Sequence, residues 1–124
     1  MVNSRGPYTV LVLLLLAVGC TKDTAREFKP ALCDTLTRTY TIDVAPIMNT
    51  NCAISSCHDA ASMANGIRLD GFIDVVNTIN SPSVDFLCAI KHEGTCFPMP
   101  KGAAKLPDNV VNMLDCWVKN GMPQ

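Results

Sequence analysis

Residues 52–58 read Cys-Ala-Ile-Ser-Ser-Cys-His, and this string is the most informative part of the 124-residue chain. It places a histidine, His58, directly after the second of two thiols, Cys52 and Cys57. Two thiols can bond to the two vinyl groups of a haem, and a histidine beside the second thiol then lies beneath the iron. The string therefore indicates covalent haem attachment, with His58 as the proximal iron ligand.

The spacing of the two thiols constrains the local backbone. The usual attachment motif has two residues between the cysteines, whereas residues 53–56 make four here. On a regular α-helix a step of three residues turns by about 300° and a step of five by about 500°, so the two thiols would point to nearly opposite sides. We therefore predict that small residues of this segment, Ala53, Ser55 and Ser56, loop out and return both sulfurs to one edge of a haem.

Two other interpretations of the same residues stay open at this point. Cys52 and Cys57 can form a disulfide beside an incidental histidine, or they can join His58 and another cysteine around zinc. Zinc is the weaker alternative if the chain is exported, because oxidising compartments favour disulfides.

Met99 is the favoured sixth ligand of the iron, and His92 is the second choice. Met99 lies between two prolines in residues 97–102, Phe-Pro-Met-Pro-Lys-Gly, and such a stiff loop can hold a thioether in place. His92 reads as a solvated histidine near the end of a predicted helix. The other methionines of the mature chain read as core residues of helices, Met48 and Met113, or as parts of mobile segments, Met63 and Met122.

The N-terminal sequence predicts export. Residues 10–18 form an unbroken apolar run that is too short to span a bilayer, and Arg5 precedes it. Residues 16–20, Leu-Ala-Val-Gly-Cys, resemble a bacterial lipoprotein signal, in which the cysteine is acylated and becomes the first mature residue. We expect a signal peptide over residues 1–19, and plain secretion and a buried core helix are the weaker alternatives.

The division of the chain follows from this leader. Residues 20–32 would form a tether anchored through the lipid on Cys20, and residues 33–124 the folded domain. The protein would then be membrane-anchored on the periplasmic or cell-surface side.

Composition limits the remaining possibilities. Ten basic and eleven acidic side chains argue against a charge-driven nucleic-acid binder, and the length allows one small domain. Seven cysteines in so short a chain indicate an oxidising compartment, a bound metal or covalent cofactor chemistry.

The pattern of apolar and polar residues predicts an all-α domain, because no stretch alternates as a strand does. Asp43 is expected to cap the first helix, which leads to Asn51. The last helix is expected to open at Pro107 and Asp108 and to stop at Asn120 and Gly121. Two short helices are expected between them, over residues 71–79 and 83–91, and a surface loop over residues 59–70.

Residues 39–124 resemble a class I c-type cytochrome of the small, exported, often lipid-anchored kind. The resemblance implies a cytochrome c-like helical domain with long loops around one covalent haem c, held by Cys52 and Cys57 and ligated by His58 and Met99. One departure is Pro107, where the family commonly has a serine or threonine cap. The matching strings are Tyr40, Asp43, Pro46 and Ile47, then Met-Pro-Lys-Gly at 99–102, Lys105-Leu106 and Trp117-Val118.

Four cysteines remain after Cys20, Cys52 and Cys57 are assigned to lipid and haem. They allow three pairings, of which we favour Cys88 with Cys96 and Cys33 with Cys116. The first pair would close a short loop just before the Met99 segment, and the second would tie the start of the domain to its last helix.

The resemblance implies a monomeric electron carrier rather than an enzyme, with redox proteins of the cell envelope as partners. Arg68 is expected to be an exposed arginine rather than a partner of a haem propionate. A haem module that binds or senses a small ligand, and a disulfide-stapled interaction protein without haem, are the alternatives. Apolar residues are expected to exclude water from the ring or to pack in the core, namely Ile67, Leu69, Phe72, Leu106, Leu114 and Trp117.

Overall fold

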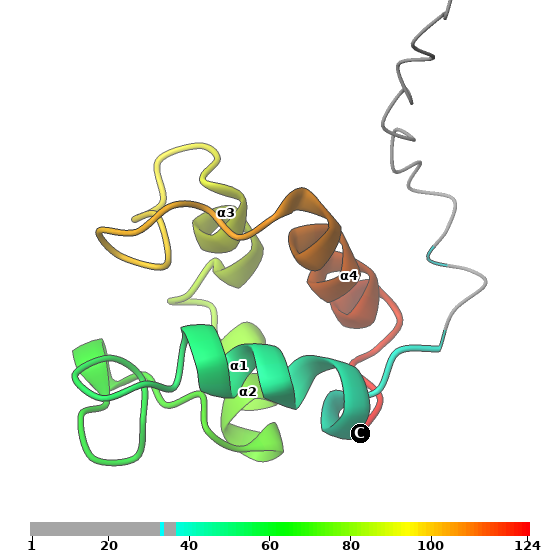
Figure 1. The fold of residues 1–124 in the computed structure, drawn as a ribbon, viewed down its shortest axis with the longest axis horizontal. Helices are drawn as coiled ribbons and strands as arrows, with labels where there is room; N and C mark the ends of the chain where they lie inside the picture. Colours follow the sequence, from blue (N-terminus) through cyan, green and yellow to red (C-terminus); the bar gives the residue numbers. More distant parts are fainter. Residues whose placement is uncertain (1–32, 34–36) are drawn as a thin grey trace, which may run out of the picture.

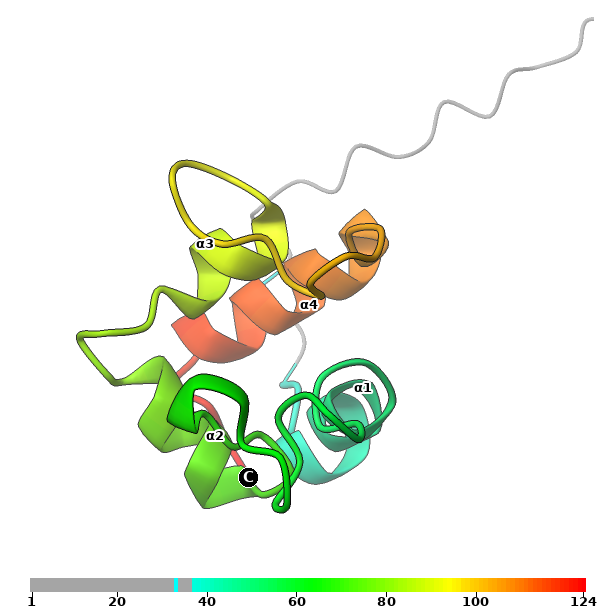
Figure 2. The same cartoon turned by 90° about the vertical axis from the view of Figure 1, so that its left-hand side faces the viewer.

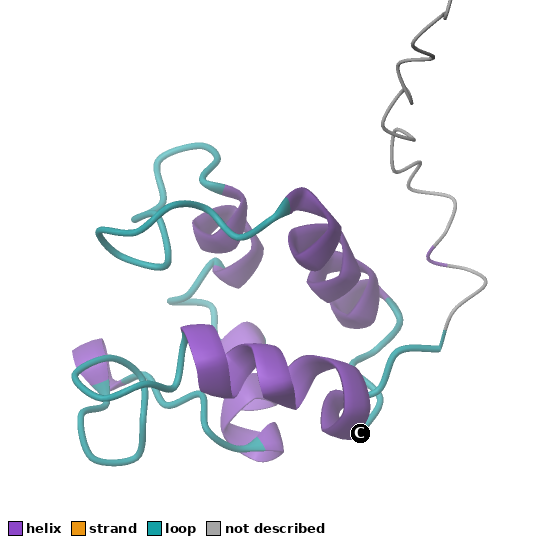
Figure 3. Ribbon diagram, viewed as in Figure 1, coloured by secondary structure: helices purple, strands orange, loops and turns teal. Residues whose placement is uncertain are grey.

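The computed structural model describes residues 33 and 37–124, and the predicted signal peptide, tether and lipidated Cys20 lie outside the described residues. All regular secondary structure in this described part is helical (Figure 3), which confirms the all-α prediction. Helices α1 and α2 lie in one half of the domain and α3 and α4 in the other (Figures 1 and 2). The helices are η2 (Tyr40–Val44), α1 (Ala45–Asn51), η3 (Ala64–Gly66), α2 (Phe72–Ile79), α3 (Phe86–Lys91) and α4 (Asp108–Lys119).

The first helix begins earlier than the sequence predicted. Its first turn is the π-helix η2, which starts at Tyr40 and runs directly into α1, so Asp43 is not the cap. Asp43 accepts hydrogen bonds from the Thr39 backbone N–H and from Arg38, both at 2.9 Å. The Thr39 bond and the Arg38 charge lower the pKa of Asp43. The carboxylate therefore stabilises the first turn from inside the helix.

Aromatic packing explains the early start. The Tyr40 ring packs edge-on against Phe72, with 5.2 Å between ring centroids, and lies 6.1 Å from Trp117. The Tyr40 N–H and the Trp117 indole N–H both donate to the carbonyl oxygen of Pro123, each at 2.9 Å. The first and last helices thus share one hydrogen-bond acceptor near the C-terminus.

The expected apolar residues form the core. Leu114 and Trp117 are fully buried, Leu69 and Leu106 nearly so, and Ile67 and Phe72 pack against them from partly buried positions. Other members of the core are Tyr40, Val44, Met48, Val75, Phe86, Ile90 and Val111.

The later helices agree with the sequence patterns except at one boundary. Helix α3 begins at Phe86 rather than at residue 83, because the Asp85 side chain accepts the Cys88 N–H at 3.0 Å and caps the helix there. Helix α4 has Pro107 as its N-cap residue and stops before Gly121, whose φ of +85° suits glycine.

Two disulfides cross-link the described residues, as predicted. The Cys33–Cys116 bond ties the start of this part of the chain to α4, and the Cys88–Cys96 bond closes the chain just after α3. These are the two pairs favoured from the sequence. No helix among the described residues combines the length and apolarity needed to cross a membrane.

Candidate functional site

The backbone around the two unpaired thiols is a closed loop and not a helix. Helix α1 ends at Asn51, and the His58 N–H donates to the Cys52 carbonyl at 3.1 Å, so the main chain closes around residues 53–57. Ser56 has a left-handed φ of +69°. The predicted interruption of the helix is confirmed. We call residues 52–69 the His58 loop.

Cys52 and Cys57 are free thiols, in contrast to the four cysteines that form disulfides. Burial raises the pKa of the Cys52 thiol to about 11, and the charge of the Cys57 thiolate adds to this increase. The disulfide between Cys52 and Cys57, which the sequence left open, is not formed.

His58 is buried, with 8% of its surface exposed, and its two ring nitrogens have different surroundings. Nδ1 lies 3.2 Å from the carbonyl oxygen of Ile67. A carbonyl only accepts hydrogen bonds, so Nδ1 carries a proton, and in the neutral ring the lone pair is then on Nε2. Nε2 makes no hydrogen bond with any residue that the structure describes. Metal-ligating histidines are commonly oriented in this way.

Two more main-chain bonds hold the ring in place. The Leu69 N–H donates to the His58 carbonyl, and the Ala64 N–H donates to the Cys57 carbonyl, both at 2.8 Å. Residues 67–69 therefore run beside His58 and contact it through both its ring and its backbone. The acceptor and donors belong to the main chain, so no residue type in the sequence marks them.

The second candidate segment is the chain between α3 and α4, residues 92–106, which we call the Met99 loop. Met99 is half-buried, and its N–H donates to the carbonyl of Ala89 at 3.0 Å. His92 is exposed, as expected, and its Nε2 lies 2.9 Å from the Met99 carbonyl oxygen. That contact occupies Nε2 of His92, which leaves the Met99 thioether as the better candidate ligand.

The two loops lie at the same end of the domain. The His58 loop (green) and the Met99 loop (yellow to orange) are both at the left of Figure 1, and both face the viewer in Figure 2. Candidate ligands about forty residues apart in the chain thus belong to loops that share one end of the fold.

The zinc interpretation gains no donor set from the described residues. Among them, three ligand atoms come within 4.8 Å of one another only at Asp85, Cys88 and Cys96. Both cysteines of that group are joined in a disulfide, so neither offers a thiolate.

Arg68 is exposed, as expected, and is paired with acidic neighbours. Its guanidinium contacts Asp70 and also lies 3.4 Å from Asp74. The hydrogen bond from Arg68 lowers the pKa of Asp70. Arg68 is thus engaged by carboxylates of its own chain.

The remaining methionines are placed by burial. Met48 is fully buried and Met113 partly buried, as core residues of helices are expected to be. Met63 is exposed. Met122 packs against the core, contrary to the expectation that it lies in a mobile segment, because its N–H donates to the Trp117 carbonyl at 3.0 Å.

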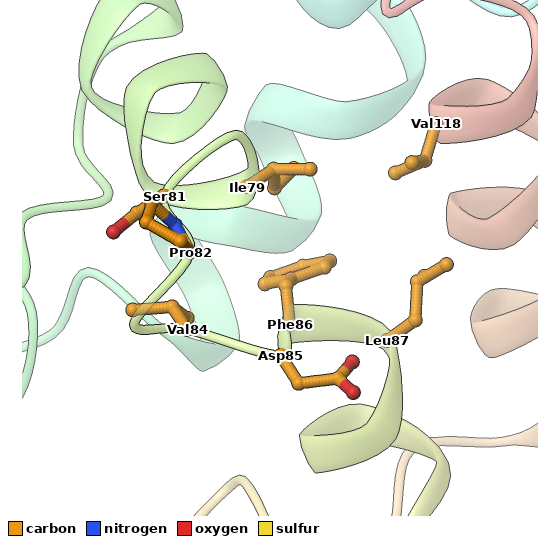
Figure 4. Close-up of a pocket in the computed structure, with 8 residues that line it drawn as sticks. All are labelled: Ile79, Ser81, Pro82, Val84, Asp85, Phe86, Leu87 and Val118. Atoms are coloured by element: carbon orange, nitrogen blue, oxygen red, sulfur yellow. The ribbon is translucent and has the colours of Figure 1, made fainter.

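A separate cavity of about 340 Å³ lies between the end of α2, the start of α3 and α4. In Figure 4 the side chains of Ile79 and Val118 point toward each other above the ring of Phe86. None of the predicted site residues lines this cavity, whose wall consists of Ile79, Ser81, Pro82, Val84, Asp85, Phe86, Leu87 and Val118.

No protein-family model, curated protein or solved structure matches the chain. The case for a cofactor at the 52–58 segment therefore depends on the residues themselves and on their geometry: two free thiols in one loop, and a buried histidine whose Nε2 makes no hydrogen bond within the described residues.

Proposed function

We propose that this protein is a mono-haem c-type cytochrome that carries single electrons between redox proteins of the cell envelope. The observation that supports this most strongly is the state of His58. Its ring is buried, its Nδ1–H is held by the Ile67 carbonyl, and its Nε2 makes no hydrogen bond within the described residues. A histidine in that state, directly after a pair of free thiols, has the donor set that covalent haem requires.

The residues fit the cofactor by their chemistry. Cys52 and Cys57 would form the two thioether bonds, His58 would ligate the iron through Nε2, and Met99 would supply the second protein ligand through its sulfur. When bound, the haem supplies an iron that exchanges one electron between its ferrous and ferric forms.

Residues of the chain would determine how the iron exchanges this electron. If both His58 and Met99 ligate the iron, the protein would leave no vacant position for a substrate, which favours electron transfer over catalysis. The thioether of Met99 favours the reduced form relative to a second histidine and so raises the reduction potential. Leu69 and Leu106, both buried, would limit the access of water to the haem.

The proposed location follows from the leader. Acylation of Cys20 would anchor an exported monomer to the membrane, with residues 20–32 as a tether to the folded domain. Partners would be redox proteins that touch the domain briefly, and no nucleic acid is involved.

The decisive experiment is a denaturing mass spectrum of protein made with a haem-attachment system, taken together with its visible spectrum. We expect the mass of one haem to remain with the chain after denaturation. The Cys57→Ser variant should lose stable attachment or keep a single thioether bond. A colourless, matured protein with the mass of the bare polypeptide plus lipid would contradict the proposal and favour a disulfide-stapled interaction protein.

The sixth ligand is tested separately. Met99→Ala should keep the haem and open the sixth position, so that the reduced protein binds carbon monoxide. Met63→Ala is the matched control, because Met63 is exposed, and it should leave the spectrum unchanged. If the parent protein itself binds carbon monoxide rapidly and in stoichiometric amount, the protein is a ligand-binding module instead.

A further inference from the structure

The backbone of Met99 is held on both sides by residues at the end of α3. Its N–H donates to the Ala89 carbonyl at 3.0 Å, and its carbonyl oxygen lies 2.9 Å from Nε2 of His92. Pro98 and Pro100 on either side have no N–H groups. The Met99 N–H is therefore the only amide donor of this three-residue stretch, and the stretch depends on α3 for its position.

The direction of the His92 contact is fixed by chemistry. A carbonyl oxygen has no hydrogen to give, so Nε2 of His92 must be the donor. His92 is the C-cap residue of α3 and has a left-handed backbone, with φ of 57° and ψ of 40°. Its own N–H contacts the Ala89 carbonyl at 3.4 Å, the same oxygen that accepts the Met99 N–H.

The cross-link next to these contacts limits the movement of the loop. Cys88 precedes Ala89 and Cys96 precedes the Pro-Met-Pro stretch, and the two are joined by a disulfide. The segment that carries Met99 is thus closed covalently at its start. The disulfide does not by itself fix the orientation of the Met99 peptide groups. Their orientation determines the direction in which the Met99 side chain leaves the backbone.

We infer that His92 is a positioning residue that aims the Met99 sulfur by donating its Nε2–H to the Met99 carbonyl. This inference rests on the proposed function for its consequence at the iron, but the contact itself can be measured without haem. His92, the second choice for an iron ligand, thus acts on the iron through Met99.

The test compares His92→Gln with His92→Leu. Glutamine keeps an N–H donor at a reach similar to that of Nε2, whereas leucine has none. Neither side chain is β-branched, so both variants carry a similar cost for the left-handed backbone at this position. Differences between the two variants therefore report the loss of the donor.

Two measurements are made on the full-length protein. The first is the visible absorption of the bond between methionine sulfur and ferric iron, together with the reduction potential. The second is hydrogen exchange of the Met99 amide, which is slowed by its bond to Ala89. We expect exchange in His92→Leu to be faster than in His92→Gln by about fivefold, the factor that corresponds to one ordinary hydrogen bond.

The outcomes separate the two claims. Weaker sulfur-to-iron absorption and faster Met99 exchange in His92→Leu, with recovery in His92→Gln, support the inference. Equal exchange in the two variants overturns it, whether or not haem is present. A colourless protein in which only His92→Leu exchanges faster would refute the proposed function and leave the His92 contact established.

Discussion

Two segments of the protein, the His58 loop and residues 88–96, each carry a pair of cysteines and a histidine, and the same residue types have opposite states in the two. In the His58 loop the thiols are free, the histidine is buried and its Nε2 has no hydrogen bond within the described residues. In the segment before Met99 the thiols form a disulfide, and the histidine is exposed with its Nε2 engaged. Residue type alone therefore does not identify a ligand site.

The two segments differ in which donor atoms remain free to bind a cofactor. The His58 loop is organised by main-chain hydrogen bonds, so its sulfurs and one ring nitrogen are left for chemistry. In the Met99 loop, Cys96 is bonded to Cys88 of α3 and His92 contacts the Met99 carbonyl, so the thioether of Met99 is the group that remains available. In the proposed function the first loop would supply the attachment points for the haem, and the second would supply a sulfur ligand.

The largest expected effect is a loss of stability on truncation of Leu69, which packs in the core next to His58. Leu69 is 5% exposed, and its N–H contacts the His58 carbonyl. Leu69→Ala should lower the free energy of unfolding by about 2 to 5 kcal/mol, because it leaves a cavity in the core. Denaturant unfolding measures this. Ile54→Ala is the control from the same loop, where the side chain is 42% exposed, and should change stability by about 0.5 kcal/mol or less. Equal effects would contradict this account of the loop.

The second effect concerns the cross-link of the other loop. The double variant Cys88→Ser/Cys96→Ser should lose about 2 to 3 kcal/mol of stability, since the closed loop is short. Mass spectrometry should find haem attachment unchanged, because the attachment thiols lie in the other loop. Cys88→Ala/Cys96→Ala should give the same loss, which would assign it to the bond rather than to the new side chains. Loss of attached haem in either variant would show that the loops are not independent.

The smallest effect is a pH dependence of the His58 loop. Because Arg68 lowers the pKa of Asp70, the folded state favours the charged carboxylate. This contribution is present above the ordinary carboxyl pKa of about 4 and is lost as the pH falls through the lower folded value. Asp70→Asn should therefore be slightly less stable than the parent at neutral pH and equal to it in acid. Hydrogen exchange of residues 67–70 follows this locally.

High salt supplies the control for the pH experiment, because it screens an exposed ion pair and should shrink the difference at neutral pH. The Cys88–Cys96 bond does not titrate in acid, so the Met99 loop should show no matching change. A difference that persists in acid would mean that Asp70 stabilises the loop by some means other than its charge.

Much of the helical framework was predictable from local patterns. The stop at Gly121 and the opening at Pro107 delimit α4, and the small, polar residues after Asp59 indicate a loop. The interruption of the helix after Cys52 was predicted from the rotation per residue of an α-helix, given that both thiols must reach one haem. The proposed chemistry of Cys52, Cys57, His58 and Met99 rests on their types and order in the sequence.

Tertiary contacts account for what the sequence did not predict. Helix η2 starts at Tyr40 because that ring packs against Phe72 and Trp117, which are distant in sequence. The bonds from His58 to the Ile67 carbonyl and from His92 to the Met99 carbonyl involve backbone oxygens, which every residue carries. The sequence treated Met99 and His92 as alternative ligands and gave no sign that His92 contacts the Met99 carbonyl.

The carbonyl oxygen of Pro123 accepts hydrogen bonds from the Tyr40 amide of η2 and from the Trp117 indole of α4. This single oxygen therefore connects the first helical segment to the last one. A purification tag or fusion partner attached directly after Gln124 would be separated from Pro123, and so from this shared acceptor, by Gln124 alone.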